Sequence, residues 1–314
     1  MRDKVMIVGG GRMGSGITAM SALAGNKTII VDVSKDQADA AVQKAEETIS
    51  FLAENGLAEK DDAKRAVDLL ESSASLEESC SQACFVIEAI IEHLETKQKL
   101  FSQLDELLPK DVIIASNTSG LCITDIALLT KNPERTITTH FWFPAHLVPL
   151  VEVVMGNRTD EKTADTVCAM LKKWNKEPVI VRKDLPGQLA NRILQAMIRE
   201  AAYIVDSGLA TAEDVDKAIK NGPGIRLPVW GVLEHVDAVG LDICKPVQES
   251  VLPELYNESK PTPLMDRMFS RGDRGFLSGK GFYDWHKKSM EALLQERDEF
   301  LIAECKRRKK KEQE

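Results

Sequence analysis

The sequence lacks several features that are typical of particular classes of protein. It has no run of about 18 apolar residues, which excludes a membrane-spanning helix. It has no excess of positive charge, since the formal net charge is −8, and this argues against nucleic-acid or membrane-surface partners, which need a basic face. The six cysteines include no C-x-x-C pair, and no H-E-x-x-H motif occurs, so we expect reduced thiols and no metal site. The first residues enter an apolar run without a signal-type segment, so we expect a cytoplasmic protein.

Short β-rich runs alternate with helical stretches up to about residue 185. The β-rich runs are VMIV, TIIVDV, ACFVIEAI, DVIIAS, RTITTHF, LVEVV and EPVIVRK, and a long charged stretch at about residues 36–71 is predicted to be helical. Alternation of this kind is typical of α/β folds with a parallel sheet. Residues 1–185 are therefore predicted to form an α/β domain with a mainly parallel sheet.

The character of the sequence changes after residue 185, where β-rich runs nearly vanish. Pro186 stands where a helix could begin, and Thr211 with Asp214 forms a T-x-x-D capping signal for a helix that Gly222 ends. The last stretch, from about residue 289, has the pattern of an amphipathic helix with a basic end. Residues 186–314 are therefore predicted to form an all-α domain.

A glycine-rich loop follows the first β-rich run, in VMIVGGGRMGSG. Gly9, Gly11 and Gly14 form G-x-G-x-x-G between a predicted strand and a predicted helix, and Asp32 ends the next strand, eighteen residues after Gly14. In dinucleotide-binding domains of the Rossmann type, such glycines permit a tight turn, the approach of a pyrophosphate and close helix packing, and the acid binds ribose hydroxyls. A glycine-rich turn in a non-binding domain is the weaker alternative. Because a carboxylate repels a 2′-phosphate, NAD is favoured over NADP. The predicted cofactor site also includes Arg12, Met13 and Asn117.

Polar side chains follow the strands of the predicted sheet near residues 117–152. Ser119 lies just past one strand, His140 ends the next, and Glu152 interrupts an apolar run twelve residues after His140. A histidine beside a bound dinucleotide can act as general base in alcohol oxidation, and a carboxylate can fix its tautomer. The alternatives are a structural histidine and a glutamate that faces solvent. His146 is close in sequence but has no comparable partner.

The motifs, taken in order, resemble those of the L-3-hydroxyacyl-CoA dehydrogenase family. The resemblance runs over nearly the whole chain, through VMIVGGGRMGSG, FVIEAIIEHLETKQKLF, IIASNTSGL, THFWFP, LVEVV, LPGQLANRIL and SGKGFYDW. It implies an NAD-dependent dehydrogenase that oxidises a secondary alcohol of the (S)-3-hydroxyacyl-CoA type, with catalytic residues Ser119, His140, Glu152 and Asn191. It also implies that Glu92 and Lys97 contact the nicotinamide half of NAD, and that the helical domain forms a homodimer.

Two departures from the family pattern bear on the substrate. The chain reads HFWFP where the family commonly has HFFNP, so Phe143 replaces an asparagine, and ISFLAENGLAEKDDAKRA carries fewer positive charges than the segment that helps to hold CoA in typical members. Side branches of the family act on small non-CoA substrates such as carnitine, sugar acids or a pyridine carboxylate. The open hypotheses are thus a CoA thioester substrate, a small non-CoA substrate, and a non-catalytic NAD-binding protein.

Overall fold

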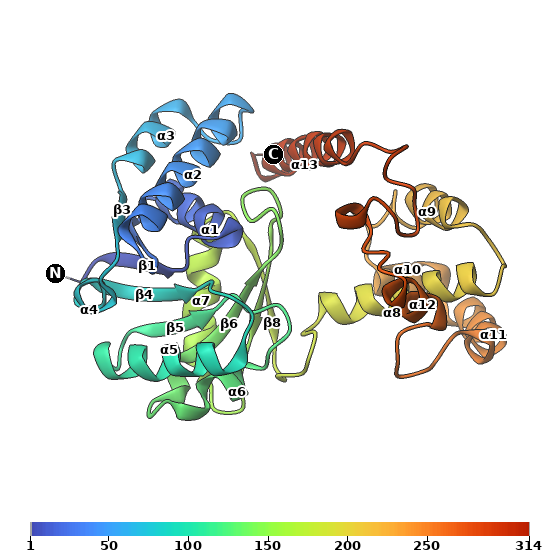
Figure 1. Ribbon diagram of the computed structural model, residues 1–314, viewed down its shortest axis with the longest axis horizontal. Helices are drawn as coiled ribbons and strands as arrows, with labels where there is room; N and C mark the ends of the chain where they lie inside the picture. Colours follow the sequence, from blue (N-terminus) through green and yellow to red (C-terminus); the bar gives the residue numbers. More distant parts are fainter. Residues whose placement is uncertain (1, 314) are drawn as a thin grey trace. The chain divides into compact units, whose positions relative to one another are not determined.

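The computed structural model describes residues 2–313, and the chain divides into two compact units (Figure 1). Unit 1 comprises the residues up to Leu189 together with those from Glu296 onward, and unit 2 comprises Ala190–Gln295. Residues 186–314 were predicted to form one helical domain. The structure instead assigns the last helix largely to unit 1, because its apolar residues Leu301 and Ile302 pack against the core of that unit.

In the described part of the chain, eight strands form one sheet in the order β3-β2-β1-β4-β5-β6-β7-β8. The strands are β1 (Lys4–Val8), β2 (Lys27–Val31), β3 (Leu70–Ser73), β4 (Ala83–Glu88), β5 (Ile113–Ser116), β6 (Thr136–Phe141), β7 (Leu150–Val154) and β8 (Glu177–Val181). All neighbouring pairs are parallel except β6 and β7. The predicted α/β class, with a Rossmann-type mainly parallel sheet followed by an all-α part, is confirmed.

Helices cover both faces of the sheet. The helices α1 (Arg12–Leu23), α2 (Lys35–Glu54) and α7 (Glu161–Lys173) share one apolar cluster, whereas α4 (Leu76–Cys80), α5 (Leu94–Leu107) and α6 (Ile123–Ile126) share another. Successive strand residues enter opposite clusters: Val5 and Ile7 join the first, and Met6 and Val8 join the second. A strand that is buried on both faces reads as a continuous apolar run, as β1 does.

The stretch at residues 36–71, predicted as one helix, contains three elements. Helix α2 is followed by α3 (Lys60–Val67), and Leu70 begins strand β3. The break lies at Gly56, whose φ of 71° is in the left-handed region that glycine adopts readily. The polar edge strand β3 was missed because its sequence, LESS, has no apolar alternation.

Unit 2 is helical in the part that the structure describes. It contains α8 (Ala190–Asp206), α9 (Ala212–Asn221), α10 (Val232–Val239), α11 (Leu241–Val251) and α12 (Pro263–Ser270), and α13 (Met290–Gln313) begins there and continues into unit 1. The predicted cap is present, since Thr211 Oγ1 accepts from Asp214 N and Gly222 ends α9. Helix α8 does not begin at Pro186, because Gly187 and Gln188 have positive φ angles, which no helix accommodates. None of the described helices is long and apolar enough to cross a membrane.

Candidate active site

The glycine loop between β1 and α1 leaves no room for a side chain at two of its three motif glycines, Gly9 and Gly14. Gly9 has a φ of 106°, and a Cβ added to Gly14 would lie 1.8 Å from Gly9 O. Gly11 precedes the first residue of α1, and a Cβ there would meet no heavy atom within 4 Å. The loop is therefore closed at Gly9 and Gly14 and open at Gly11, where a pyrophosphate can approach the N-terminus of the helix.

Asp32, which follows β2, is tied to this loop. Its Oδ2 accepts from Gly10 N at 2.6 Å, and its Oδ1 accepts from Val33 N at 2.7 Å. A carboxylate offers about four lone-pair sites, so these two bonds leave capacity for ribose hydroxyls. Arg12 is exposed at the start of α1, and the partly buried Met13 packs against the first apolar cluster. The residues present thus fit a dinucleotide.

His140 and Glu152 lie opposite each other on the antiparallel strands β6 and β7. The His140 Nδ1 atom is 2.7 Å from Glu152 Oε2, and the two side chains are 7% and 0% exposed. Glu152 also accepts from Trp142 Nε1 at 3.0 Å and from Leu189 N at 2.9 Å. Because Glu152 already accepts from two N–H donors, we assign the ring proton of His140 to Nδ1, where it can donate to the same carboxylate, and Nε2 is then free to accept a proton.

The loop after β5 is held by Glu92, which lies between β4 and α5. Glu92 Oε1 accepts from Thr118 Oγ1 at 2.6 Å and from Ser119 N and Gly120 N, each at 3.0 Å. Desolvation would raise the pKa of Glu92, but these bonds and the Lys97 charge outweigh it and hold the pKa below its ordinary value. The exposed Ser119 is therefore carried on a loop that an anchored carboxylate fixes.

Asn117 connects this loop with the strand that carries His140. Its backbone N–H donates to Glu88 O at 2.7 Å, and its side-chain Oδ1 accepts from Phe141 N at 2.9 Å. These bonds join the ends of β4, β5 and β6. Ligands of parallel sheets bind at this carboxyl edge.

Lys97 was predicted to contact the cofactor, and the structure places it in a buried ionic network. Its side chain is 1% exposed, with Nζ 2.5 Å from Glu88 Oε1 and 3.4 Å from Glu92 Oε2. The other Glu88 oxygen accepts from Ser116 Oγ at 2.6 Å. Glu88 was not predicted as part of this network. The acid at the end of the apolar run ACFVIE was a usable signal, because a buried carboxylate needs hydrogen-bond donors.

Asn191 is the second residue of α8 and belongs to unit 2, so it comes from a different unit than Ser119, His140 and Glu152. It is half-buried. The hydrogen bond from Leu189 N to Glu152 fixes the chain of unit 1 just before α8 begins.

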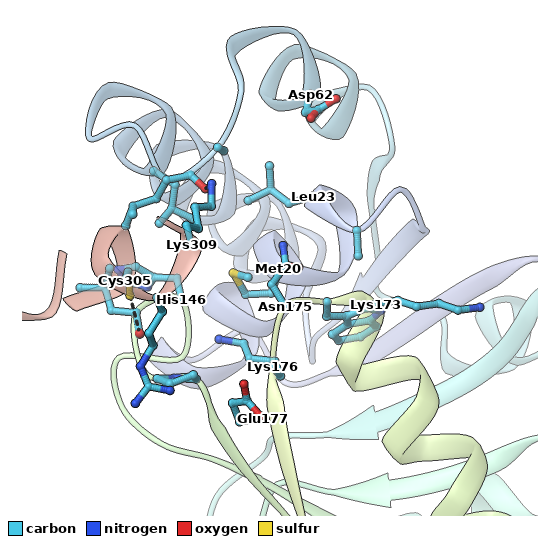
Figure 2. Close-up of a pocket in the computed structure, with 18 of the residues that line it drawn as sticks. Met20, Leu23, Asp62, His146, Lys173, Asn175, Lys176, Glu177, Cys305 and Lys309 are labelled. Atoms are coloured by element: carbon cyan, nitrogen blue, oxygen red, sulfur yellow. Dashed lines mark hydrogen bonds between the residues drawn. The ribbon is translucent and has the colours of Figure 1, made fainter. Parts of the chain in front are cut away.

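His146 lies in a separate cavity of about 540 Å³ within unit 1, lined by parts of α1, α2, α7, α13 and the loop between β6 and β7 (Figure 2). His140, Glu152 and Ser119 are absent from its lining. Burial, followed by the nearby Lys176 charge, lowers the pKa of His146 to about 4. Two atoms hold the β6–β7 loop on this side: Lys176 Nζ donates to Ala145 O, and Cys305 Sγ of α13 donates to Leu147 O. The cavity is thus distinct from the His140–Glu152 pair.

Two family descriptions match almost the whole chain. Residues 4–185 match "3-hydroxyacyl-CoA dehydrogenase, NAD binding domain", and residues 187–285 match "3-hydroxyacyl-CoA dehydrogenase, C-terminal domain". The chain belongs to the 3-hydroxyacyl-CoA dehydrogenase family. Its members are NAD-dependent oxidoreductases that act on CH–OH groups, and NAD is the cofactor.

Relatives in this family carry different names. A probable 3-hydroxybutyryl-CoA dehydrogenase of Bacillus subtilis is 38% identical over 91% of this chain and 98% of its own length. A 5-formyl-3-hydroxy-2-methylpyridine 4-carboxylate 5-dehydrogenase of Mesorhizobium japonicum is 32% identical over 96% and 97%. A solved structure of an enzyme with this pyridine-carboxylate dehydrogenase name is described as an NAD+-dependent dismutase. It matches with a TM-score of 0.88 and 30% identity, over 96% of this chain and 97% of its own. The structure of an (S)-3-hydroxybutyryl-CoA dehydrogenase of Ralstonia eutropha matches with a TM-score of 0.75, 33% identity and coverage of 90% and 99%.

Proposed function

We propose that this protein oxidises the secondary alcohol of an (S)-3-hydroxyacyl-CoA substrate, such as 3-hydroxybutyryl-CoA, to the 3-keto product, with His140 as general base. The observation that carries the proposal is the buried His140–Glu152 pair, at 2.7 Å, with His140 near the end of β6, on the same edge of the sheet as the dinucleotide loop after β1. The names of relatives that align over about nine tenths of the chain support the acyl-CoA substrate.

The proton step follows from the tautomer. His140 Nε2 takes the proton of the substrate hydroxyl while Glu152, bonded at Nδ1, stabilises the imidazolium that forms. NAD, when bound, supplies the acceptor for the hydride that leaves the carbinol carbon. The alcohol thereby loses one proton and one hydride and becomes a ketone. A positioned base of this kind contributes roughly 10²- to 10⁴-fold to the rate.

Two further side chains are proposed to hold the reacting oxygen. Ser119 stands exposed on the loop that Glu92 anchors, and its hydroxyl can donate to that oxygen or relay a proton to His140. Asn191, from the helical unit, can donate its amide N–H to the same oxygen as the carbonyl forms. Both assignments are supported by the family motifs SNTSGL and LANRIL.

The cofactor site is proposed to comprise Gly9, Gly11, Arg12, Met13, Gly14, Asp32, Glu92, Lys97 and Asn117. The open position at Gly11 supports pyrophosphate binding at the N-terminus of α1, and Asp32 supports NAD over NADP. Because Lys97 is buried, its proposed part is to fix Glu92 toward the nicotinamide end.

A second candidate is the same chemistry on a small non-CoA substrate, and helix α13 favours it. The C-terminal family match ends at residue 285, before α13, and the pyridine-carboxylate enzyme aligns over more of the chain than the 3-hydroxybutyryl-CoA dehydrogenases do. Lys309 Nζ of α13 donates to Leu57 O in the turn between α2 and α3, and the Arg297 guanidinium lies 5.3 Å from the Phe143 ring centroid. The segment whose family counterpart helps to hold CoA is thus in contact with α13 here.

We also propose a cytoplasmic homodimer that forms through unit 2. The six cysteines are free, which supports a reducing compartment. Several large apolar side chains of unit 2 are exposed, among them Ile225, Val229, Leu233, Leu241, Ile243 and Val247. Exposed apolar side chains are frequent at protein interfaces, and these residues support unit 2 as the surface of the proposed dimer.

The test is NADH formation with (S)-3-hydroxybutyryl-CoA, free (S)-3-hydroxybutyrate, carnitine and a pyridine-carboxylate aldehyde. We expect turnover of the CoA thioester, a loss of about 10²-fold or more in His140→Ala, and wild-type rates in His286→Ala, which removes an exposed histidine of unit 2. Turnover of a free acid or aldehyde with weak inhibition by CoA would select the second candidate. NAD binding without oxidation of any alcohol or aldehyde would leave a non-catalytic binding protein.

A further inference from the structure

Trp142 shares the carboxylate oxygen that orients His140. The Trp142 Nε1–H group donates to Glu152 Oε2 at 3.0 Å, and the same oxygen faces His140 Nδ1 at 2.7 Å. The rings of His140 and Trp142 have centroids 5.7 Å apart and are tilted by 50°. The indole thus lies beside the imidazole, and both rings contact the same oxygen of Glu152.

The sequence explains how this contact forms. His140 lies on β6, which ends at Phe141, and Trp142 is the next residue, two positions from His140. Side chains two apart on an extended strand project from the same face. Glu152 lies opposite His140 on β7, so it meets both rings. An indole N–H can only donate a hydrogen bond. Both rings therefore draw on the negative charge of Glu152 Oε2, and the indole reduces the share that stabilises the imidazole.

Neighbouring groups come from β8, from the end of β5 and from α13. On β8, Val179 lies opposite Glu152, and from the end of β5 the neutral amide of Asn117 meets Phe141 N. On α13, the Arg297 guanidinium lies over the adjacent Phe143 ring and is paired with Asp298. Among the ion pairs of the described residues, that of His140 is with Glu152.

We infer that Trp142 is a positioning residue that limits how strongly Glu152 stabilises the protonated form of His140. A second N–H on Oε2 fixes the carboxylate rotamer and disperses its negative charge. Each proton taken from substrate is then released more readily from Nε2 before the next turnover. The inference rests on the proposed role of His140 as the base, but the coupling between the indole, the carboxylate and the imidazole is a property of the folded protein alone.

The test compares two substitutions at position 142. Trp142→Phe keeps an aromatic ring and removes the N–H, whereas Trp142→Gln replaces the ring but places an amide N–H the same number of bonds from Cβ. Without the N–H, Glu152 attracts the imidazolium more strongly, so the acid limb of the kcat/KM profile moves to higher pH. We expect kcat/KM at a pH below the midpoint of that limb to fall about three- to tenfold in Trp142→Phe, the range that one hydrogen bond supplies. KM for the alcohol substrate should stay unchanged, and Trp142→Gln should retain most of the wild-type profile.

Trp230→Phe is the matched control. Trp230 is in unit 2, and its indole Nε1 has no hydrogen-bond partner in the structure, so the same chemical deletion removes no bond. Its pH profile should coincide with that of the wild type. A profile that moves equally in Trp142→Phe and Trp142→Gln, or that does not move in Trp142→Phe, overturns the inference.

A measurement without substrate separates this inference from the proposed function. In protein with ¹³C-labelled histidine rings, the His140 titration followed by NMR should move to higher pH in Trp142→Phe and stay in place in Trp230→Phe. If that shift occurs in a protein that oxidises no alcohol, the inference stands and the proposed function fails. If turnover is normal and the His140 titration is the same in wild type and Trp142→Phe, the proposed function stands and the inference fails.

Discussion

Unit 1 and unit 2 cover their apolar side chains to very different extents. In unit 1, clusters of buried apolar residues fill both faces of the sheet. In unit 2, which spans described residues 190–295, the buried side chains are Ala202, Thr262 and Met268. Both units contain amphipathic helices, so the difference lies in what covers the helices. A helical unit with uncovered apolar faces needs a further surface against which to pack.

This difference in burial suits the two units to different tasks. Unit 1 holds several polar site groups in buried, hydrogen-bonded positions, and Glu152, Lys97 and Asn117 are each fixed by its own strands and loops. Rigid placement of this kind is what a proton-transfer site needs. Unit 2 offers exposed surface instead, which suits recognition and assembly. Substitutions in the two units should therefore fail in different ways.

The largest effect is expected from Glu152→Gln in unit 1. The amide cannot stabilise an imidazolium as a carboxylate does, and its NH₂ group opposes one of the donors from His140, Trp142 or Leu189. We expect kcat to fall about 10²- to 10⁴-fold with little change in the affinity for NAD. Steady-state kinetics and calorimetric NAD titration measure the two quantities. A kcat within threefold of wild type would show that the pair does not act as base and orienter.

A pair of glycine substitutions sharpens the account of the cofactor loop. Gly14→Val should remove measurable NAD binding, because its Cβ would lie 1.8 Å from Gly9 O and force the loop apart. Gly11→Ala should leave the fold intact, since open space surrounds that position, and lower NAD affinity about tenfold by crowding the pyrophosphate. Fluorescence titration with NAD and circular dichroism separate the two outcomes. Equal affinities in both variants would contradict the assignment of the glycine loop.

The next effect tests unit 2 directly. Leu233 on α10 is 80% exposed, and Leu128 of unit 1 is 70% exposed. Leu233→Glu should weaken the proposed dimer by about two orders of magnitude, because a carboxylate would be buried in the proposed interface. Leu128→Glu, the same change on the unit with a closed core, should leave assembly unchanged. Sedimentation at several protein concentrations distinguishes them. If Leu233→Glu and Val229→Glu both dimerise as the wild type does, the exposed face of unit 2 is not the interface.

Features that depend on neighbouring residues were predicted well from the sequence, whereas contacts between distant segments were predicted poorly. Gly9, Gly11, Gly14 and Asp32 were placed correctly in a strand–turn–helix–strand unit, because each follows from neighbours along the chain. The contact between His140 and Glu152 was also expected, although the antiparallel register that creates it was not.

The features that were not predicted from the sequence depend on contacts between segments that are far apart along the chain. The donors to Glu152 from Trp142 and Leu189, the burial of Lys97 against Glu88, and the packing of α13 on unit 1 each need the complete fold. The change in composition predicted a boundary near residue 185, and the compact units divide after Leu189. The return of residues 296–313 to unit 1 was not predicted, because the pattern of an amphipathic helix does not say which element its apolar face will pack against.

The smallest effect concerns the separate cavity of unit 1 and depends on pH. The pKa of His146 is lowered from 6.5 to about 4, first by burial and then by the Lys176 charge. Between these pH values the unfolded chain binds a proton that the folded protein does not, so stability falls as the pH decreases from 6.5 toward 4. This group alone should remove about 2 kcal/mol between pH 7 and pH 5.

His146→Phe should abolish that part of the pH dependence, because a phenyl ring can keep the contact that His146 makes with Phe51 and cannot titrate. Urea unfolding at pH 7 and pH 5 gives the free energies, and the difference between the two pH values is compared in wild type and variant. His286→Phe, at an exposed site of unit 2, should keep the wild-type difference. If His146→Phe and wild type lose the same stability on acidification, His146 is not the group responsible. A smaller loss in the variant would show that burial keeps this second histidine of unit 1 neutral, away from the His140–Glu152 pair.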